Sequence, residues 1–160
     1  MDGSETTTEN IAAVPAVELA GTWHLSDCTV TYPNGKVTRP WARSASGCLI
    51  YAPDGHVCTS LNYPRLDGRL ECRSFCGEYR IVGDRIYHFI TVSNDLREIG
   101  TVQEQRIALD RDRLTLTAHP APAGGPGSSV QYIWHRAGSA DASDGSTARG
   151  FAGKSFNRAS

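Results

Sequence analysis

The stretch FCGEYRIVGDRIYHFITVS, residues 75–93, decides the fold class of this chain. It holds two runs rich in β-branched and aromatic residues, Phe75–Val82 and Arg85–Ser93, separated by the turn dipeptide Gly83-Asp84. Two such runs joined by a short turn are typical of a β-hairpin. We therefore expect two antiparallel strands here.

The same pattern continues in both directions along the chain, and helical periodicity is nearly absent between its ends. Turn signals recur at Asn34-Gly35, Pro53-Asp54-Gly55 and Arg111-Asp112. Further strands are expected over Thr22–Tyr32, Gly47–Ala52, Val57–Asn62, Thr101–Asp110, Arg113–Ala118 and Val130–Arg136. About eight strands joined by hairpins predict an all-β fold, a single up-and-down antiparallel β-barrel that closes around one small ligand. A β-sandwich is the alternative, but links between neighbouring strands favour the barrel.

The ends of the chain differ in composition from the part between them. Residues 1–17 and 138–160 are rich in Ser, Thr, Ala, Gly and Asp, so we expect a flexible N-terminal segment and a disordered C-terminal tail. The barrel is then confined to residues 18–137. Two longer links, Asn62–Ser74 and Asn94–Gly100, are expected at a mouth or lid.

Charge and hydropathy exclude several classes of protein. The formal net charge of the 160 residues is −1 and the basic residues are scattered, which argues against a nucleic-acid surface. No run of 18 apolar residues is present, and the start of the chain lacks the basic and apolar regions of a secretory signal. We therefore expect no nucleic-acid or membrane partner and a cytoplasmic location.

The cysteines and histidines do not have the spacing of a metal or redox site. In the expected reducing compartment, the odd number of cysteines favours free thiols. The five are Cys28, Cys48, Cys58, Cys72 and Cys76. No metal site and no cofactor are predicted, because no metal-ligand spacing, phosphate-binding loop or Gly-x-Ser-x-Gly turn is found.

The order of several motifs resembles the lipocalin-like domain family of bacterial and fungal small barrels. These motifs are ELAGTWHL at 18–25, GCLIYAPDGHV at 47–57, residues 75–93, GTVQEQRIALDRDRLTL at 100–116 and VQYIWHR at 130–136. The resemblance implies a small-ligand barrel, in several relatives associated with natural-product biosynthesis, and barrels of this shape include cofactor-free cyclases or isomerases. It further implies that Trp23 closes one end of the barrel beneath the guanidinium of Arg136. The chain departs from the family at Phe89, where relatives often carry a second histidine.

Strand alternation predicts which side chains face inward. Trp23 and Leu25 set the odd positions of the first strand inward, which brings in Asp27. The apolar positions predict that Phe75, Gly77, Tyr79 and Ile81 of the first central run face inward, with Ile86, His88, Ile90 and Val92 of the second. Similar alternation points Leu114, Leu116, Val130, Tyr132 and Trp134 inward. Ile107 and Leu109 are expected to face inward as well, so the predicted interior is mainly apolar. Its predicted polar groups are Asp27, Tyr51, Tyr79, His88, Gln103, Gln105 and Tyr132.

His88 is the main catalytic candidate, because an imidazole lies here between apolar neighbours and titrates near neutrality. Asp27 would orient it and stabilise its protonated form. Alternatively, His88 is a core residue bonded to a backbone carbonyl. Tyr51, Tyr79, Gln103, Gln105 and Tyr132 are candidate ligand contacts, or they only stiffen the wall.

Two functions are consistent with these residues. The first is a cofactor-free cyclase or isomerase that acts on a hydrophobic intermediate in secondary-metabolite biosynthesis, with His88 and Asp27 moving a proton. The alternative is a non-catalytic carrier of a small hydrophobic metabolite. Haem binding through His88 is a third and weaker hypothesis.

Overall fold

The computed structural model describes residues 14–40, 45–65, 67–121 and 125–139. In this part of the chain one short helix, α1 (Ala16–Leu19), precedes nine strands. The strands are β1 (Gly21–Thr31), β2 (Val37–Thr38), β3 (Ser46–Tyr51), β4 (His56–Pro64), β5 (Leu70–Val82), β6 (Arg85–Ser93), β7 (Val102–Asp110), β8 (Arg113–Ala118) and β9 (Ser129–Arg136).

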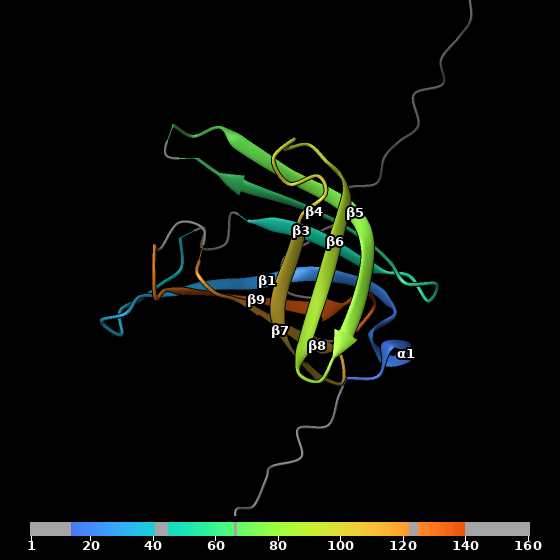
Figure 1. The fold of residues 1–160 in the computed structure, drawn as a ribbon. Helices are drawn as coiled ribbons and strands as arrows, with labels where there is room; N and C mark the ends of the chain where they lie inside the picture. Colours follow the sequence, from blue (N-terminus) through green and yellow to red (C-terminus); the bar gives the residue numbers. More distant parts are fainter. Residues whose placement is uncertain (1–13, 41–44, 66, 122–124, 140–160) are drawn as a thin grey trace, which may run out of the picture.

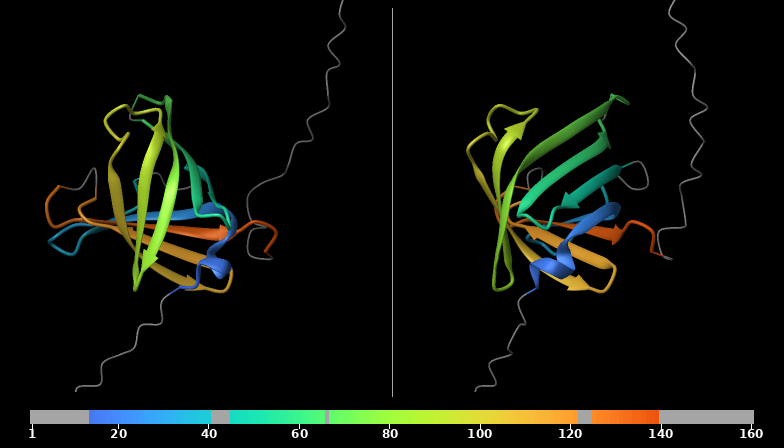
Figure 2. Two further views of the ribbon diagram at one scale, coloured as in Figure 1. Left: turned by 45° about the vertical axis from the view of Figure 1, so that its right-hand side comes forward. Right: turned by 90° about the vertical axis from the view of Figure 1, so that its right-hand side faces the viewer.

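The strands form one closed antiparallel barrel, as the sequence predicts. Their order is β2-β1-β3-β4-β5-β6-β7-β8-β9, and pairing of β1 with β9 closes the sheet (Figure 1). Eight strands make up the barrel, because β2 only adds two residues beside the end of β1. Strands β5–β7 run across the direction of β1 and β9 (Figure 2). A sheet that closes on itself rules out the β-sandwich alternative.

The hairpin turns form where the turn residues predict them. Between β3 and β4, Gly55 has a φ of 93°, a conformation that favours glycine. The Asp54 carboxylate accepts a hydrogen bond of 3.1 Å from the backbone N–H of His56, and the N–H of Ala52 donates to the carbonyl of His56. The side chain and the glycine together explain why this turn could be found in the sequence.

The predicted loop over Asn62–Ser74 is wrong for most of its length. Strand β4 continues to Pro64 and β5 already begins at Leu70, and these two residues pair in register. The turn between them is closed by a hydrogen bond of 2.7 Å from the N–H of Arg65 to the carbonyl of Arg69. The strands extend beyond their apolar residues because backbone pairing does not require an apolar side chain. The other predicted link, Asn94–Gly100, does lie outside the strands.

A β-bulge in β6 corrects the predicted direction of Val92. Cys76 of β5 pairs with Val92, and Gly77 pairs with Ile90, so Thr91 is the extra residue. Ile86, His88 and Ile90 face inward as predicted, but Val92 after the bulge is 62% exposed. A Cβ at Gly77 would overlap the carbonyl oxygen of Phe89, so glycine permits this close approach of the two strands.

One end of the barrel is closed by Trp23, which has no exposed surface. Its indole N–H donates to the carbonyl of Leu19 in α1 at 3.0 Å, and the Arg136 guanidinium lies 4.2 Å from the ring centroid. Arg136 also donates to the carbonyls of Glu18 and Ala20 and to the carboxylate of Asp112. The predicted Trp–Arg arrangement is therefore confirmed, and we call this the closed end.

The predicted terminal segments lie mostly outside the described residues. Of the N-terminal segment 1–17, only 14–17 are described, and Ala16 and Val17 belong to α1. Of the C-terminal tail 138–160, only Gly138 and Ser139 are described.

Candidate functional site

The inner wall of the barrel is built from alternate residues of each strand. His88 lies at its centre on β6, 2% exposed, between the buried side chains of Ile86 and Ile90. The predicted inward directions are confirmed for most strands. The confirmed inner residues include Phe75, Tyr79, Ile107, Leu114, Leu116, Val130, Tyr132 and Trp134.

A hydrogen bond across the interior joins His88 to Tyr51. The Tyr51 Oη atom lies 2.8 Å from Nε2 of His88, and both side chains are almost fully buried. Strands β3 and β6 are not neighbours in the sheet, since β4 and β5 lie between them. The bond therefore spans the interior. The partner of His88 is thus a tyrosine hydroxyl and not the backbone carbonyl considered as the alternative.

Burial sets the protonation of both partners. It lowers the pKa of His88 from 6.5 to about 4, so the imidazole is neutral near pH 7. It also raises the pKa of Tyr51 well above its usual value, with a smaller contribution from Tyr79, so the phenol keeps its proton. A neutral histidine has one N–H donor and one acceptor nitrogen. The phenol O–H can therefore donate to Nε2, which places the imidazole proton on Nδ1.

Aromatic rings surround this pair. Tyr79 packs edge-on against Tyr51, with ring centroids 4.8 Å apart, and Phe75 lies 5.8 Å from the His88 ring. The Tyr79 hydroxyl donates to the carbonyl of Ala52 at 3.1 Å. The predicted contact residues Tyr51 and Tyr79 are thus brought together beside His88, with the Tyr79 hydroxyl engaged by the backbone.

Two glutamines lie on the neighbouring strand β7. Gln103 pairs in register with His88, and Gln105 pairs with Ile86, so both are placed on the inner face as predicted. Each is partly buried. Four buried side-chain atoms of the described residues have no hydrogen-bond partner: Oε1 of Gln105, Nδ1 of His88, Nε1 of Trp134 and Nδ1 of His135. The interior therefore contains an unpartnered amide acceptor and an unpartnered imidazole nitrogen.

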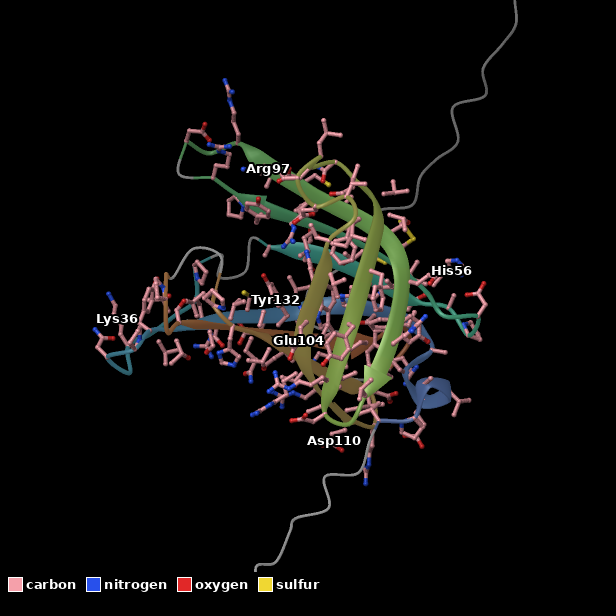
Figure 3. The ribbon with its side chains drawn as sticks, in the orientation of Figure 1. Lys36, His56, Arg97, Glu104, Asp110 and Tyr132 are labelled. Atoms are coloured by element: carbon pink, nitrogen blue, oxygen red, sulfur yellow. A yellow bond between two sulfur atoms is a disulfide. The ribbon has the colours of Figure 1, made fainter. Side chains whose placement is uncertain are left out.

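Tyr132 lies farther from the closed end, on β9. It pairs in register with Cys28 of β1, and Figure 3 shows it in the middle of the molecule. Burial raises the pKa of Tyr132 to about 12, with a further contribution from Cys28. The pKa of Cys28 is also raised to about 12, first by burial and then by Asp27. Both groups are therefore uncharged near neutral pH.

An ion pair that the sequence analysis missed lies on the inner face near the β6–β7 link. Arg73 of β5 pairs with Glu98 of that link, and the Ser93 hydroxyl donates to the other carboxylate oxygen at 3.0 Å. The Arg73 guanidinium lies 5.9 Å from the Phe75 ring. The signal was available, because odd residues of this strand face inward. The predicted loop over Asn62–Ser74 hides this signal, because Arg73 belongs to β5. We call the end marked by this link, which lies away from α1 in Figure 1, the open end.

The predicted inward direction of Asp27 is wrong. The pairing of β1 with β9 shifts between Leu25 and Asp27, so Ser26 is an extra residue and alternation reverses after it. Cys28 and Val30 are the buried residues that follow. The Asp27 carboxylate instead lies 3.2 Å from Nε of Arg39, with 29% of its side chain exposed. It therefore does not pair with His88.

The expectation of free thiols is wrong for two cysteines. Cys58 and Cys76 lie opposite each other on β4 and β5 and form a disulfide. Cys28, Cys48 and Cys72 are free.

The disulfide lines a hollow of about 420 Å³ on the outer face of β3–β6. Cys48, Ile50 and Val92 also line this hollow, together with Ser60 and Ser74, whose hydroxyls are 2.6 Å apart. Alternation places these side chains outside the barrel. We call this hollow the outer groove; the buried residues Thr59 and Phe75 of the inner wall form its floor.

No group of three or more His, Cys, Asp or Glu side chains in the described residues is arranged to hold a metal ion. The helix in the same residues is too short to cross a membrane.

The described residues thus form a closed eight-stranded antiparallel barrel with an apolar interior and a Trp–Arg closed end, which is the fold that the sequence resemblance implies. Comparison with protein families agrees: residues 20–74 match the lipocalin-like domain family, which confirms the resemblance seen in the sequence. No curated protein matches the chain significantly.

Solved structures with a similar barrel have low sequence identity. A lipocalin-like protein from Bacteroides uniformis is 19% identical, with 74% of this chain and 98% of that chain covered and a TM-score of 0.44. A protein from Bacteroides eggerthii is 16% identical, with coverage of 73% and 98% and a TM-score of 0.39. A de novo designed fluorescence-activating β-barrel is 16% identical, with coverage of 76% and 95% and a TM-score of 0.41.

Proposed function

We propose that this barrel binds a small, mainly apolar organic molecule in its interior and acts as a carrier or sequestering protein. The observation that carries the proposal is the buried Tyr51–His88 pair, which lies in an otherwise apolar and aromatic interior. An apolar site with a few oriented polar groups is the usual chemistry of small-molecule recognition. The closed end at Trp23 and the polar residues Arg73 and Glu98 near the open end support entry from the open end.

The alternative, a cofactor-free cyclase or isomerase of secondary metabolism, has less support. Asp27 lies on the outer face and cannot orient His88. His88 has a pKa of about 4, which makes it a weak base near neutral pH. An enzyme of this kind would have to rely mainly on confining its substrate. Haem ligation gains no support either, because Nε2 of His88 is bonded to Tyr51.

The first experiment locates the binding site of a neutral fluorescent probe. N-phenyl-1-naphthylamine, whose emission rises in apolar surroundings, should bind the wild-type protein. Tyr132→Trp, which adds bulk inside the barrel, should weaken binding by about fivefold or more. Gln131→Trp places the same ring on the exposed side of the same strand and should leave the affinity unchanged.

A third variant distinguishes the interior from the outer groove. Ile50 is 42% exposed and lines that groove, so Ile50→Glu places a charge there. Loss of probe binding in Ile50→Glu together with full binding in Tyr132→Trp would show that the probe occupies the outer groove and would overturn the proposal.

The carrier and enzyme hypotheses differ in the fate of the bound molecule. A compound that copurifies with the protein should return chemically unchanged after incubation and extraction, as checked by mass spectrometry and retention time. A rearranged product with the same mass would favour the isomerase.

A further inference from the structure

We infer that the ligand of the interior is an uncharged carbonyl compound whose oxygen accepts a hydrogen bond from Nδ1–H of His88, with an N–H or O–H that donates to Gln105. This inference rests on the proposed function and names the chemical class that the same site takes. It concerns two of the four buried side-chain atoms that have no hydrogen-bond partner in the described residues, Nδ1 of His88 and Oε1 of Gln105; the other two are Nε1 of Trp134 and Nδ1 of His135.

The Tyr51 hydroxyl determines which hydrogen-bonding group His88 offers. Tyr51 holds Nε2 at 2.8 Å, and no other hydrogen bond of its hydroxyl is found among the described residues. The phenol proton therefore points to Nε2, and Nδ1 becomes the donor. A buried donor without a partner is unfavourable, so an occupant with an acceptor oxygen is preferred over a hydrocarbon.

Gln105 adds the opposite requirement. Gln105 lies on the inner face of β7, opposite Ile86, and its neighbour on that face, Gln103, lies opposite His88. Its unpartnered atom is the carbonyl oxygen Oε1, which accepts hydrogen bonds. A ligand with one acceptor and one donor, such as an amide or a hydroxyketone, satisfies both atoms.

The surroundings favour a neutral and partly aromatic ligand. Phe75 and Tyr79 pack against the Tyr51–His88 pair, and no ion pair is found beside it in the described residues. The cationic group on the inner face, Arg73, is already neutralised by Glu98. A carboxylate at His88 would lose its hydration without gaining an opposite charge.

The test uses three probes of nearly equal shape, α-methylstyrene, acetophenone and benzamide. The first has no strong hydrogen-bonding group, the second has a carbonyl acceptor, and the third has an acceptor and a donor. Dissociation constants are measured by NMR titration of wild type and variants, and each variant is compared with wild type for the same probe. This comparison cancels the different hydration of the free probes.

The double variant Tyr51→Phe with His88→Phe removes both polar groups of the pair. It should raise the dissociation constants of acetophenone and benzamide by about tenfold. It should leave α-methylstyrene within about twofold, because that probe makes no hydrogen bond. Gln105→Met should weaken benzamide alone, by about fivefold. Glu104→Met alters the exposed neighbour on the same strand and should change none of the three (Figure 3).

A measurement on the wild type does not depend on how the variants fold. Long-range ¹H–¹⁵N spectra should show the His88 proton on Nδ1, and its resonance should move with acetophenone but not with α-methylstyrene. A proton on Nε2, or equal losses for all three probes in the variants, would overturn the inference while the proposed function stands. Failure of every probe to bind the wild type would overturn the proposed function itself.

Discussion

The Trp23–Arg136 pair at the closed end and the Tyr51–His88 pair in the interior differ in how completely their buried polar atoms are hydrogen-bonded. At the closed end, the indole N–H of Trp23 and the guanidinium of Arg136 each have protein acceptors. At His88 one nitrogen is bonded to Tyr51, and the other has no partner among the described residues. Satisfied buried groups stabilise a fold, whereas unsatisfied ones oppose it unless something else binds them. This contrast agrees with a stabilising role for the Trp23–Arg136 pair and with the binding role proposed for the interior.

The largest expected effect is at the closed end. Trp23→Ala should lower the free energy of unfolding by about 3–5 kcal/mol, because it removes a fully buried indole and leaves a cavity. Urea unfolding at neutral pH measures this change. His24→Ala, at the exposed neighbour on the same strand, is the control and should stay within about 0.5 kcal/mol of wild type. A loss below about 1 kcal/mol in Trp23→Ala would contradict a stabilising closed end.

The second effect is a pH dependence that originates at His88. Its pKa is about 4 in the folded protein and 6.5 in the unfolded chain, so between these values only the unfolded chain takes up the proton. Stability should therefore fall as the pH drops from about 6.5 to about 4, by on the order of 3 kcal/mol in total, and should be level above that window.

His88→Phe isolates this contribution from the titration of carboxylates, whose effect it leaves in place. The difference in unfolding free energy between wild type and His88→Phe should change across the window, as measured by urea unfolding at several pH values. The matched control is His24→Ala, which removes an exposed histidine. The same pH profile in wild type and His88→Phe would show that His88 is not buried in its neutral form.

The third effect separates the stability of the Tyr51–His88 pair from its role in binding. Tyr51→Phe should lower the unfolding free energy by about 1–2 kcal/mol, because Nε2 of His88 then loses its donor inside the barrel. Adding His88→Phe should recover most of this loss, since both members of the bond are then apolar. Simple addition of the two single effects, measured by urea unfolding, would show that the two side chains do not interact.

The features that could be predicted from the sequence are those that depend on local patterns. Turns such as Asp54-Gly55 and the alternation of regular strands are local, so the strands, the barrel and the inward direction of His88 follow from the sequence. The bulges at Ser26 and Thr91 reverse the alternation of inward and outward side chains. For this reason the inward directions predicted for Asp27 and Val92 are wrong. Ser26 carries no local signal of a bulge.

Pairing between distant elements is also absent from the local pattern. The hydrogen bond between Tyr51 and His88 joins strands that are not neighbours, so it depends on how the whole barrel closes. The Cys58–Cys76 disulfide depends on the register of β4 with β5, and a predicted loop over residues 62–74 leaves that register undetermined.

The smallest expected effect tests whether Asp27 has any part in the site. Asp27→Asn removes an ion pair with Arg39, whose own side chain is 66% exposed, so the unfolding free energy should change by less than about 1 kcal/mol. The affinity for acetophenone should not change, because the carboxylate lies on the opposite face of β1 from Cys28 and the interior. NMR titration of Asp27→Asn beside wild type measures that affinity. A tenfold loss of affinity in a folded Asp27→Asn would mean that Asp27 acts on the interior despite the bulge. It would contradict the assignment of Asp27 to the outer face of the barrel.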